Sequence, residues 1–351
     1  MKFKRLTPIA VDIGDTRVSI LQLALRGTER HVHAWASFAR LSPDSGFEAE
    51  ASRISGVLRR RGFVGTDLAL CLPDSSTFGA VLELPPARSG APLRAIAAAE
   101  IGRMFKQNPE MLELAMWEVP IPARQSGTTS CMVVACPHEC TDPIFDAFAR
   151  HELDLRTLEP RSASVARACA VIATPAPQDL QAVLSLGWKQ TRFLAMTHSQ
   201  VVLERAIEGA DLETLHRVVA GTLGLDTDLA EIAVSDAVSG GRTLLTDPDA
   251  AREIRDLLLH FADKLSAEVL TATSYIGRRC GGRKLARVLL ESAIPTAESL
   301  RDMIAERLPF DVRSTTLAEL GLGGSLQREQ AQRGELAACF GLCLSQEAGA
   351  C

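Results

Sequence analysis

A glycine turn between two apolar strands occurs twice in this chain, and this repeat constrains the fold more than any other feature. The segment Ile9–Leu25 predicts a strand, a polar turn around Gly14 and a second strand, because apolar residues alternate on both sides of the turn. The segment Leu180–Leu194 repeats the pattern around Gly187. We therefore predict a duplicated α/β protein whose two halves face each other across a cleft.

The two turns form a candidate phosphate-binding site. Glycine lets the backbone come close to a ligand, and neighbouring amides, hydroxyl groups and cationic side chains can hold a phosphate. One side of this site would consist of Asp12, Gly14, Thr16 and Arg17, and the other of Gly187, Lys189 and Gln190. The alternative interpretations are a plain hairpin turn at Gly14 and a solvated side chain at Lys189.

The composition indicates an ordinary globular protein. Of the 351 residues, 46% are hydrophobic and 23% are charged, which is enough apolar sequence for two or three domains. The net charge of −5 gives no reason to expect nucleic acid as a partner. We interpret the basic clusters Arg59–Arg61 and Arg278–Lys284 as solvated surfaces. No apolar run is long enough for a membrane span or a signal peptide, so we expect a cytoplasmic protein.

The nine cysteines lie in apolar contexts, which favours buried free thiols in a reducing compartment. Cys131, Cys136, His138 and Cys140 are close enough in sequence to raise the question of zinc. Zinc sites usually pair two such ligand clusters, and the sequence has no second one. We therefore interpret Cys131 and Cys136 as residues of a packed strand and predict no metal site.

The order of the predicted elements divides the chain into three units. The first half covers residues 1–81 and is completed by residues 160–178 and by a C-terminal helix within 334–351. Residues 82–159 form an inserted α/β unit, and residues 179–333 form the second half. Helices are expected at residues 48–61, 93–104, 142–149, 162–172, 212–223, 250–276, 296–308 and 334–344, and further strands at 31–38, 67–72, 78–84, 112–119, 130–136, 201–206, 285–290 and 310–313.

Motifs spread over nearly the whole chain occur in an informative order. Val11–Val18 has the form of a first phosphate loop, Leu82–Pro86 and Trp117–Pro120 flank a predicted helix, and Val133–Glu139 precedes Leu153–Glu159. In this order and spacing the chain resembles the PilM family of type IV pilus assembly proteins, relatives of FtsA in the superfamily of actin, sugar kinases and heat-shock ATPases. The resemblance implies an α/β, actin-like (ribonuclease H-like) duplicated fold with an inserted subdomain of the FtsA/PilM 1C type.

The resemblance also implies an ATP and magnesium site, and there the sequence departs from the pattern. Asp15 replaces a usual Ser or Thr, Ser185 stands where ATP-binding relatives carry an acidic residue, and Glu291–Pro295 replaces a glycine-rich adenosine loop. These changes remove a metal ligand and a close backbone approach. We expect ATP and Mg²⁺ to bind weakly or not at all and predict no catalytic residue. If nucleotide binding is retained, the resemblance assigns it to Asp12, Gly14, Asp15, Thr16, Arg17, Gly187, Lys189, Gln190 and Glu268.

The resemblance implies a scaffold that links an inner-membrane pilus or secretion complex to cytoplasmic motors. Its partner would be the cytoplasmic N-terminal peptide of a PilN-like inner-membrane protein, held between subdomains 1A and 1C, with other pilus or secretion subunits as further partners. The protein would be peripheral to the inner membrane through these partners alone. Phe78, Val81 and Leu84 are the candidate groove residues, and their alternative interpretation is the core of a strand.

Two other functions are compatible with the superfamily. An ATP-dependent small-molecule kinase needs a catalytic aspartate and a glycine-rich adenosine loop, and the sequence has neither in the expected places. An FtsA-like filament-forming protein carries a C-terminal amphipathic anchor, whereas Gly341–Cys351 is short and lacks basic residues.

Overall fold

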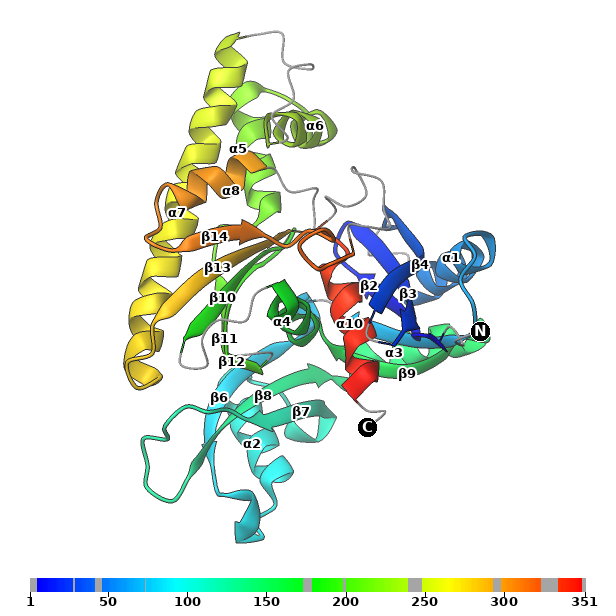
Figure 1. Ribbon diagram of the computed structural model, residues 1–351, viewed down its shortest axis with the longest axis vertical. Coiled ribbons are helices and arrows are strands. Elements are labelled where there is room, and N and C mark those ends of the chain that lie inside the picture. Colours follow the sequence, from blue (N-terminus) through cyan, green and yellow to red (C-terminus); the bar gives the residue numbers. More distant parts are fainter. Residues whose placement is uncertain are drawn as a thin grey trace.

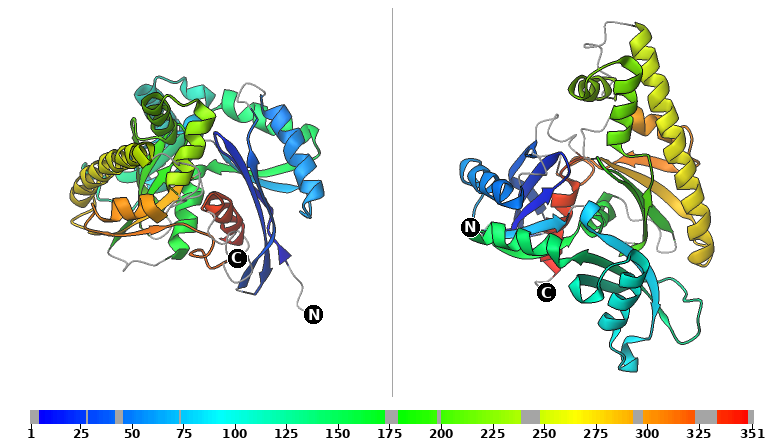
Figure 2. Two further views of the ribbon diagram at one scale, coloured as in Figure 1. Left: turned by 90° about the horizontal axis from the view of Figure 1, so that it is seen from above. Right: turned by 180° about the vertical axis from the view of Figure 1, so that it is seen from behind.

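The protein consists of three sheets with helices packed on and between them (Figure 1). The computed structural model describes residues 5–27, 29–41, 46–72, 74–172, 179–197, 200–238, 248–292, 298–322 and 334–348. Helices α4 (Arg161–Ile172) and α10 (Ala337–Ala348) lie between the first and second sheets, and together with both sheets they form the largest core (Figure 2). Within the described residues, no helix is both long and apolar enough to cross a bilayer.

The first sheet is built around the first glycine turn. Its strands lie in the order β1-β3-β2-β5-β9, with β4 on the outer side of β3. Strands β2, β5 and β9 are parallel, and β3 is antiparallel to β2 and β4. The bounds are β1 (Arg5–Leu6), β2 (Ile9–Ile13), β3 (Arg17–Arg26), β4 (Glu29–Ala39), β5 (Asp67–Leu72) and β9 (Asp154–Pro160).

Both faces of the first sheet are covered, and successive side chains of β2 pack alternately on one face and the other. Ile9, Val11 and Ile13 pack against α1 (Gly46–Arg60) and α3 (His138–Arg150), whereas Ala10 faces the core that contains α4 and α10. All five residues of β2 are buried, as expected for a central strand between two helix layers.

The second sheet repeats the arrangement of the first. Its order is β12-β11-β10-β13-β14, which matches β4-β3-β2-β5-β9 strand for strand in sequence order and direction. The bounds are β10 (Leu180–Leu186), β11 (Thr191–Thr197), β12 (Gln200–Ile207), β13 (Leu285–Ser292) and β14 (Asp311–Ser314). Helices α5 (Leu212–Leu223), α6 (Thr227–Val238), α7 (Pro248–Arg279) and α8 (Glu298–Ala305) belong to this half. The duplication predicted from the two glycine turns is confirmed.

The third sheet is inserted between β5 and β9. It contains β6 (Phe78–Leu84), β8 (Thr129–Pro137) and β7 (Leu112–Glu118) in that order, all antiparallel, with α2 (Leu93–Phe105) packed on one face. Short 3₁₀ turns are η2 (Asp74–Ser76), η3 (Ala87–Ser89) and η4 (Pro109–Met111). The insert also contacts the second half of the protein, where Trp117 Nε1 donates a hydrogen bond to the Val201 carbonyl at 3.1 Å.

The inserted sheet differs in extent from the unit predicted at residues 82–159. Strand β6 begins at Phe78, and β9 pairs in parallel with β5 of the first sheet rather than with the insert. Helix α3 packs against α1, because Ile144, Ala147 and Phe148 belong to the same core as the first half. The chain therefore returns to the first half at α3, about one helix earlier than the sequence predicts.

Most other predicted elements are present, with shifted ends. Helix α3 begins at His138, one turn before the predicted start, because Pro143 is accommodated inside the helix. Helix α6 was not predicted, and the last helix begins at Ala337 rather than at residue 334. The predicted Pro175–Pro177 linker and the Thr246–Asp247 helix start lie outside the described residues.

Candidate functional site

The two glycine turns meet across a small cavity between the halves of the protein. The Gly14 amide donates to the Arg17 carbonyl at 2.9 Å, and a Cβ at position 14 would lie 3.2 Å from that oxygen. A Cβ at position 187 would clash with the Gln190 carbonyl oxygen. The second turn therefore needs Gly187 for its tight backbone, whereas a side chain at position 14 would require a small shift of the Arg17 carbonyl.

The cavity collects most of the residues predicted for nucleotide binding. Of the nine residues assigned from the sequence, seven line it, namely Asp12, Gly14, Asp15, Thr16, Arg17, Gly187 and Gln190. Lys189 contributes its backbone amide to Asp15 Oδ2 at 3.3 Å, so the turns are joined directly. Glu268 is elsewhere, on α7, where it forms an ion pair with Arg205 of β12 at 3.0 Å.

Arg161, the first residue of α4, lies at the centre of this site. Its Nε donates to Asp12 Oδ2 at 3.0 Å, and Nη1 donates to Ser185 Oγ at 3.0 Å. Nη1 and Nη2 donate to the two carboxylate oxygens of Glu291 at 3.0 and 2.6 Å. Ser185 Oγ also donates to Glu291 at 2.5 Å. No sequence motif marks Arg161, whereas Ser185 and Glu291 stand out in the sequence as departures from an ATP site.

The charges at this centre compensate one another. Arg161 is 7% exposed and is surrounded by the carboxylates of Asp12 and Glu291, with Asp74 at 3.6 Å. Burial opposes the charged guanidinium, but these carboxylates raise the pKa of Arg161 well above its ordinary value. Burial raises the pKa of Asp12, although Arg161 acts in the opposite direction. A bidentate arginine–carboxylate pair is the arrangement that best satisfies buried charges of this kind.

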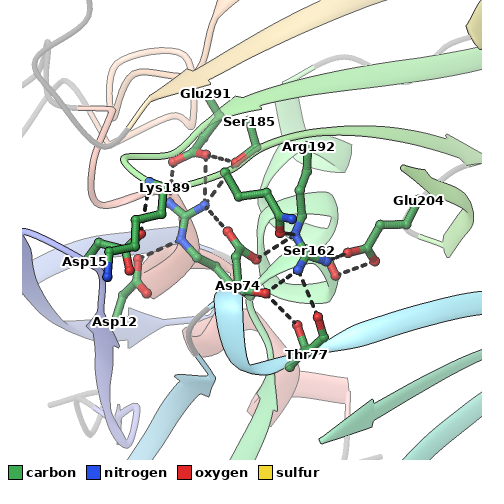
Figure 3. A network of polar contacts seen from close by, with 12 residues as sticks. Asp12, Asp15, Asp74, Thr77, Ser162, Ser185, Lys189, Arg192, Glu204 and Glu291 are labelled. Atoms are coloured by element: carbon green, nitrogen blue, oxygen red, sulfur yellow. Dashed lines mark hydrogen bonds and ion pairs between the residues drawn. The ribbon is translucent and has the colours of Figure 1, made fainter. Parts of the chain in front are cut away.

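A second buried arginine ties the same site to the inserted sheet. Arg192 of β11 donates to the Thr77 carbonyl at 3.0 Å and to the Asp74 carbonyl, at the point where the chain leaves the first half for β6. Its guanidinium also pairs with Glu204 of β12, which in turn accepts a hydrogen bond from Ser162 Oγ at 2.9 Å. Asp74 pairs with both Arg161 and Arg192, so one polar network joins the first two sheets to the segment that leads into β6. Figure 3 shows the contacts of Arg192 in this network.

The site does not fit a nucleotide with its metal in this arrangement. The cavity has a volume of about 40 Å³, whereas small-molecule sites usually enclose about 300 Å³ or more. The Arg161 guanidinium occupies the space between Asp12 and Glu291, and these two carboxylates would repel phosphate. Among the described residues, no group of three metal-type ligands comes together. The end of the region predicted to replace the adenosine loop, residues 293–295, lies outside the described residues.

The cysteine cluster belongs to a strand and the helix that follows it. Cys131 and Cys136 are buried on β8, and Cys140 lies in the first turns of α3. Burial raises the pKa of the Cys136 thiol to about 12, so this thiol stays protonated at neutral pH.

A larger groove lies between the inserted sheet and the first half. It has a volume of about 420 Å³ and is lined by the β7 residues Glu113–Ala115, by Phe145 and Asp142 of α3, and by Leu158 of β9, among others. Strand β7 is at the end of the three-stranded order, and the Phe145 ring is 45% exposed. The groove therefore combines an end strand of the insert, an exposed aromatic ring and two carboxylates, of which Glu113 pairs with Arg94.

The three residues predicted for a peptide groove do not line this one. Leu84 is 1% exposed and packs in the core beneath α2. The Phe78 ring lies 4.7 Å from the Phe105 ring, and Val81 packs against the main core. Leu84 is therefore a core residue of the strand, whereas Phe78 and Val81 are only partly buried.

Comparison with solved structures shows which fold this is. The protein in the PilM-PilN type IV pilus biogenesis complex matches with a TM-score of 0.77 and 15% identity, over 98% of this chain and 99% of that chain. The chain has an actin-like fold. MreB 5 of Spiroplasma citri bound to AMPPNP (TM-score 0.53, 10% identity, 98% and 96% covered) shares it. So does the ethanolamine utilization protein EutJ from Carboxydothermus hydrogenoformans (0.53, 13%, 97% and 89%).

The resemblance to PilM inferred from the motifs thus agrees with the likeness of the structures, and the predicted fold class is confirmed. No family model matches the sequence, and no curated protein matches it.

Proposed function

We propose that this protein is a PilM-like scaffold of a type IV pilus or a related secretion machine. Its partner is the cytoplasmic N-terminal segment of a PilN-like inner-membrane protein, so the protein works in the cytoplasm and reaches the membrane only through its partners. The observation that carries the proposal is the likeness to PilM, which extends over 98% of this chain and comes from a complex with PilN.

We place the partner segment in the groove beside β7. An extended peptide adds to an exposed sheet edge through main-chain hydrogen bonds, while pockets next to the edge select its side chains. Here the edge belongs to β7, although its Leu114 carbonyl already accepts a hydrogen bond from Arg94 at 2.9 Å. Phe145 and Leu158 supply apolar surface. Asp142 at the rim favours a segment that carries a basic residue, whereas Glu113 already pairs with Arg94.

The interdomain cleft does not need nucleotide in this proposal. Arg161 already joins Asp12 of the first half to Ser185 and Glu291 of the second, which is the connection that a bound metal nucleotide would supply. We infer that ATP binds weakly or not at all and that the protein is a pseudo-ATPase. Because Asp12 is paired with Arg161, it is not available as a catalytic base, which argues against a kinase.

The proposal is tested with a synthetic peptide that copies the N-terminal segment of the PilN-like protein encoded in the same genome. Fluorescence anisotropy of the labelled peptide should show saturable binding, and Phe145→Ser should weaken it about tenfold or more because an exposed aromatic anchor is lost. Leu229→Ser is the matched control, because Leu229 is 51% exposed on α6 and far from β7 in sequence.

Absence of binding, or equal weakening by both variants, would overturn the peptide assignment. The nucleotide part is tested separately by calorimetric titration with ATP and Mg²⁺. Micromolar affinity that is lost in Gly14→Glu would contradict the pseudo-ATPase while leaving the scaffold intact.

A further inference from the structure

Helix α1 carries a row of mostly basic side chains beside its buried apolar face. Ala51, Ile54 and Leu58 are buried against the first sheet. Arg53, Val57 and Arg60 follow one another at spacings i, i+4 and i+7, which places them on one side of the helix, and Arg61 is the next residue after the helix ends. The basic cluster interpreted from the sequence as a solvated surface is therefore part of an ordered row.

This row faces a groove along the edge of β4. The groove has a volume of about 440 Å³ and is lined by residues 35–38 of β4 together with Arg53, Val57, Arg60 and Arg61. Successive side chains of a strand point to opposite faces, so a groove that touches four consecutive residues runs along the strand's edge. In the described part of the chain β4 pairs with β3 alone, so no strand covers this edge.

The groove is strongly basic in a protein with a net charge of −5. Its lining contains three arginines and no carboxylate. Arg53 is fixed, since Nη1 donates to the Ala39 carbonyl at 2.7 Å and the guanidinium lies 4.7 Å from the centre of the Phe38 ring. Arg60 and Arg61 are exposed, and no carboxylate among the described residues forms an ion pair with either.

We propose that this groove binds an extended acidic segment of a partner protein, which adds to the edge of β4. The edge supplies main-chain hydrogen bonds, Trp35 and Val57 supply apolar contact, and the arginines pair with alternate carboxylates of the segment. This lining fits an extended peptide better than a lone phosphate or a lipid head group, because neither of these can form a ladder of main-chain hydrogen bonds with a strand edge. The inference is independent of the PilN-like partner, because the groove shares no residue with the one beside β7.

The simpler explanation for Arg59–Arg61 is that cations stabilise the C-terminal end of a helix. That role predicts a loss of stability when an arginine is replaced, but no ligand. The test therefore measures both binding and thermal midpoint.

The probe is a fluorescein-labelled peptide of about ten residues in which valine and glutamate alternate, the pattern of a strand with one acidic face. We expect saturable binding by anisotropy, about tenfold weaker binding to Arg60→Glu, and little change with Arg255→Glu. Arg255 is the matched control because it is also exposed on a helix. Hydrogen exchange of the amides of residues 35–38 should slow when the peptide is added.

Three results would overturn the proposal. The first is equal binding of a peptide with lysine in place of glutamate, or equal weakening by both variants, since either means non-specific attraction. The second is unchanged amide exchange in β4. The third is Arg60-dependent binding of phosphatidylglycerol vesicles or inorganic phosphate with no binding of the acidic peptide, which assigns the groove to a membrane surface or a phosphate instead.

Discussion

Arg161 and Glu291, which are 130 residues apart in the sequence, form a two-pronged ion pair in the centre of the protein, with donor to acceptor distances of 3.0 and 2.6 Å. Glu291 is completely buried at the end of β13, and Arg161 begins α4 of the first half. The pair therefore spans the cleft and belongs to neither half alone.

Removing Arg161 should strongly destabilise the fold. Arg161→Ala leaves Glu291 and Asp12 buried without their cation, which costs about 3 to 5 kcal/mol of unfolding free energy. Urea unfolding measures the loss. Millimolar methylguanidinium should raise the thermal midpoint of the variant but not of the natural protein, because it can occupy the vacated space. Arg103→Ala is the control, since Arg103 is exposed and pairs only with Glu100 in the described structure, and it should cost less than about 1 kcal/mol.

The unfolding free energy should depend on pH through His216. Burial against Trp188 lowers the pKa of His216 to about 4, from an ordinary 6.5. Between these values the unfolded chain binds the proton and the folded chain does not, so stability rises with pH in this window and is lost as pH falls. The full change is about 3 kcal/mol.

His216→Phe keeps the ring contact with Trp188 and should remove this part of the pH dependence. The exposed His260 offers the comparison, and His260→Phe should leave the profile unchanged. An identical slope between pH 4 and 6.5 in His216→Phe and the natural protein would contradict the assignment.

Replacement by alanine should lower the unfolding free energy at Gly187, which lies in a tight turn, and raise it at Gly221, which lies in a helix. Gly187→Ala places a methyl group against the Gln190 carbonyl, so the turn must rearrange, and we expect a loss of about 2 kcal/mol or more. Gly221 lies within α5 with no atom within 4 Å of an added Cβ. Gly221→Ala should raise stability by about 0.5 to 1 kcal/mol. Chemical denaturation of both variants decides whether the second turn is as tight as described.

Arg192 should control how firmly the inserted sheet is held. Arg192→Met removes the donors to the Asp74 and Thr77 carbonyls, so the amides of β6 should exchange faster with solvent. The amides of β2 and β5 should keep their rates, because neither strand contacts Arg192 through a hydrogen bond. Uniformly faster exchange in all strands would indicate general destabilisation instead.

Local patterns in the sequence were sufficient to predict the duplicated fold. Each half contains two strands with alternating apolar residues, joined by a tight turn that contains a glycine. They were insufficient for Arg161. A helix that begins with Arg-Ser-Ala-Ser is locally unremarkable, and its role arises only when residues 12, 185 and 291 converge in space. Ser185 and Glu291 were visible as departures from an ATP site, but not as partners of each other.

The limits of the inserted unit were misjudged for a related reason. Strand β9 joins the first sheet by parallel pairing with β5, a partner about 85 residues earlier in the chain, and strand pairing at such distance leaves no local signal. Phe78, Val81 and Leu84 form an apolar strand in the sequence, and such a pattern does not show which face of the strand another element covers. Helix α2 covers Leu84, whereas the open surface is on the opposite side of the insert, beside β7.

The hydrogen bond from Trp117 to Val201 has a mechanical consequence. A segment added to β7 and pulled along its length would load all of its main-chain hydrogen bonds at once, in shear, rather than one after another as in peeling. Through Trp117 part of that tension would pass directly into β12, and from there into the body of the second half. In the proposed complex, such an attachment would resist traction best along the direction of the strand.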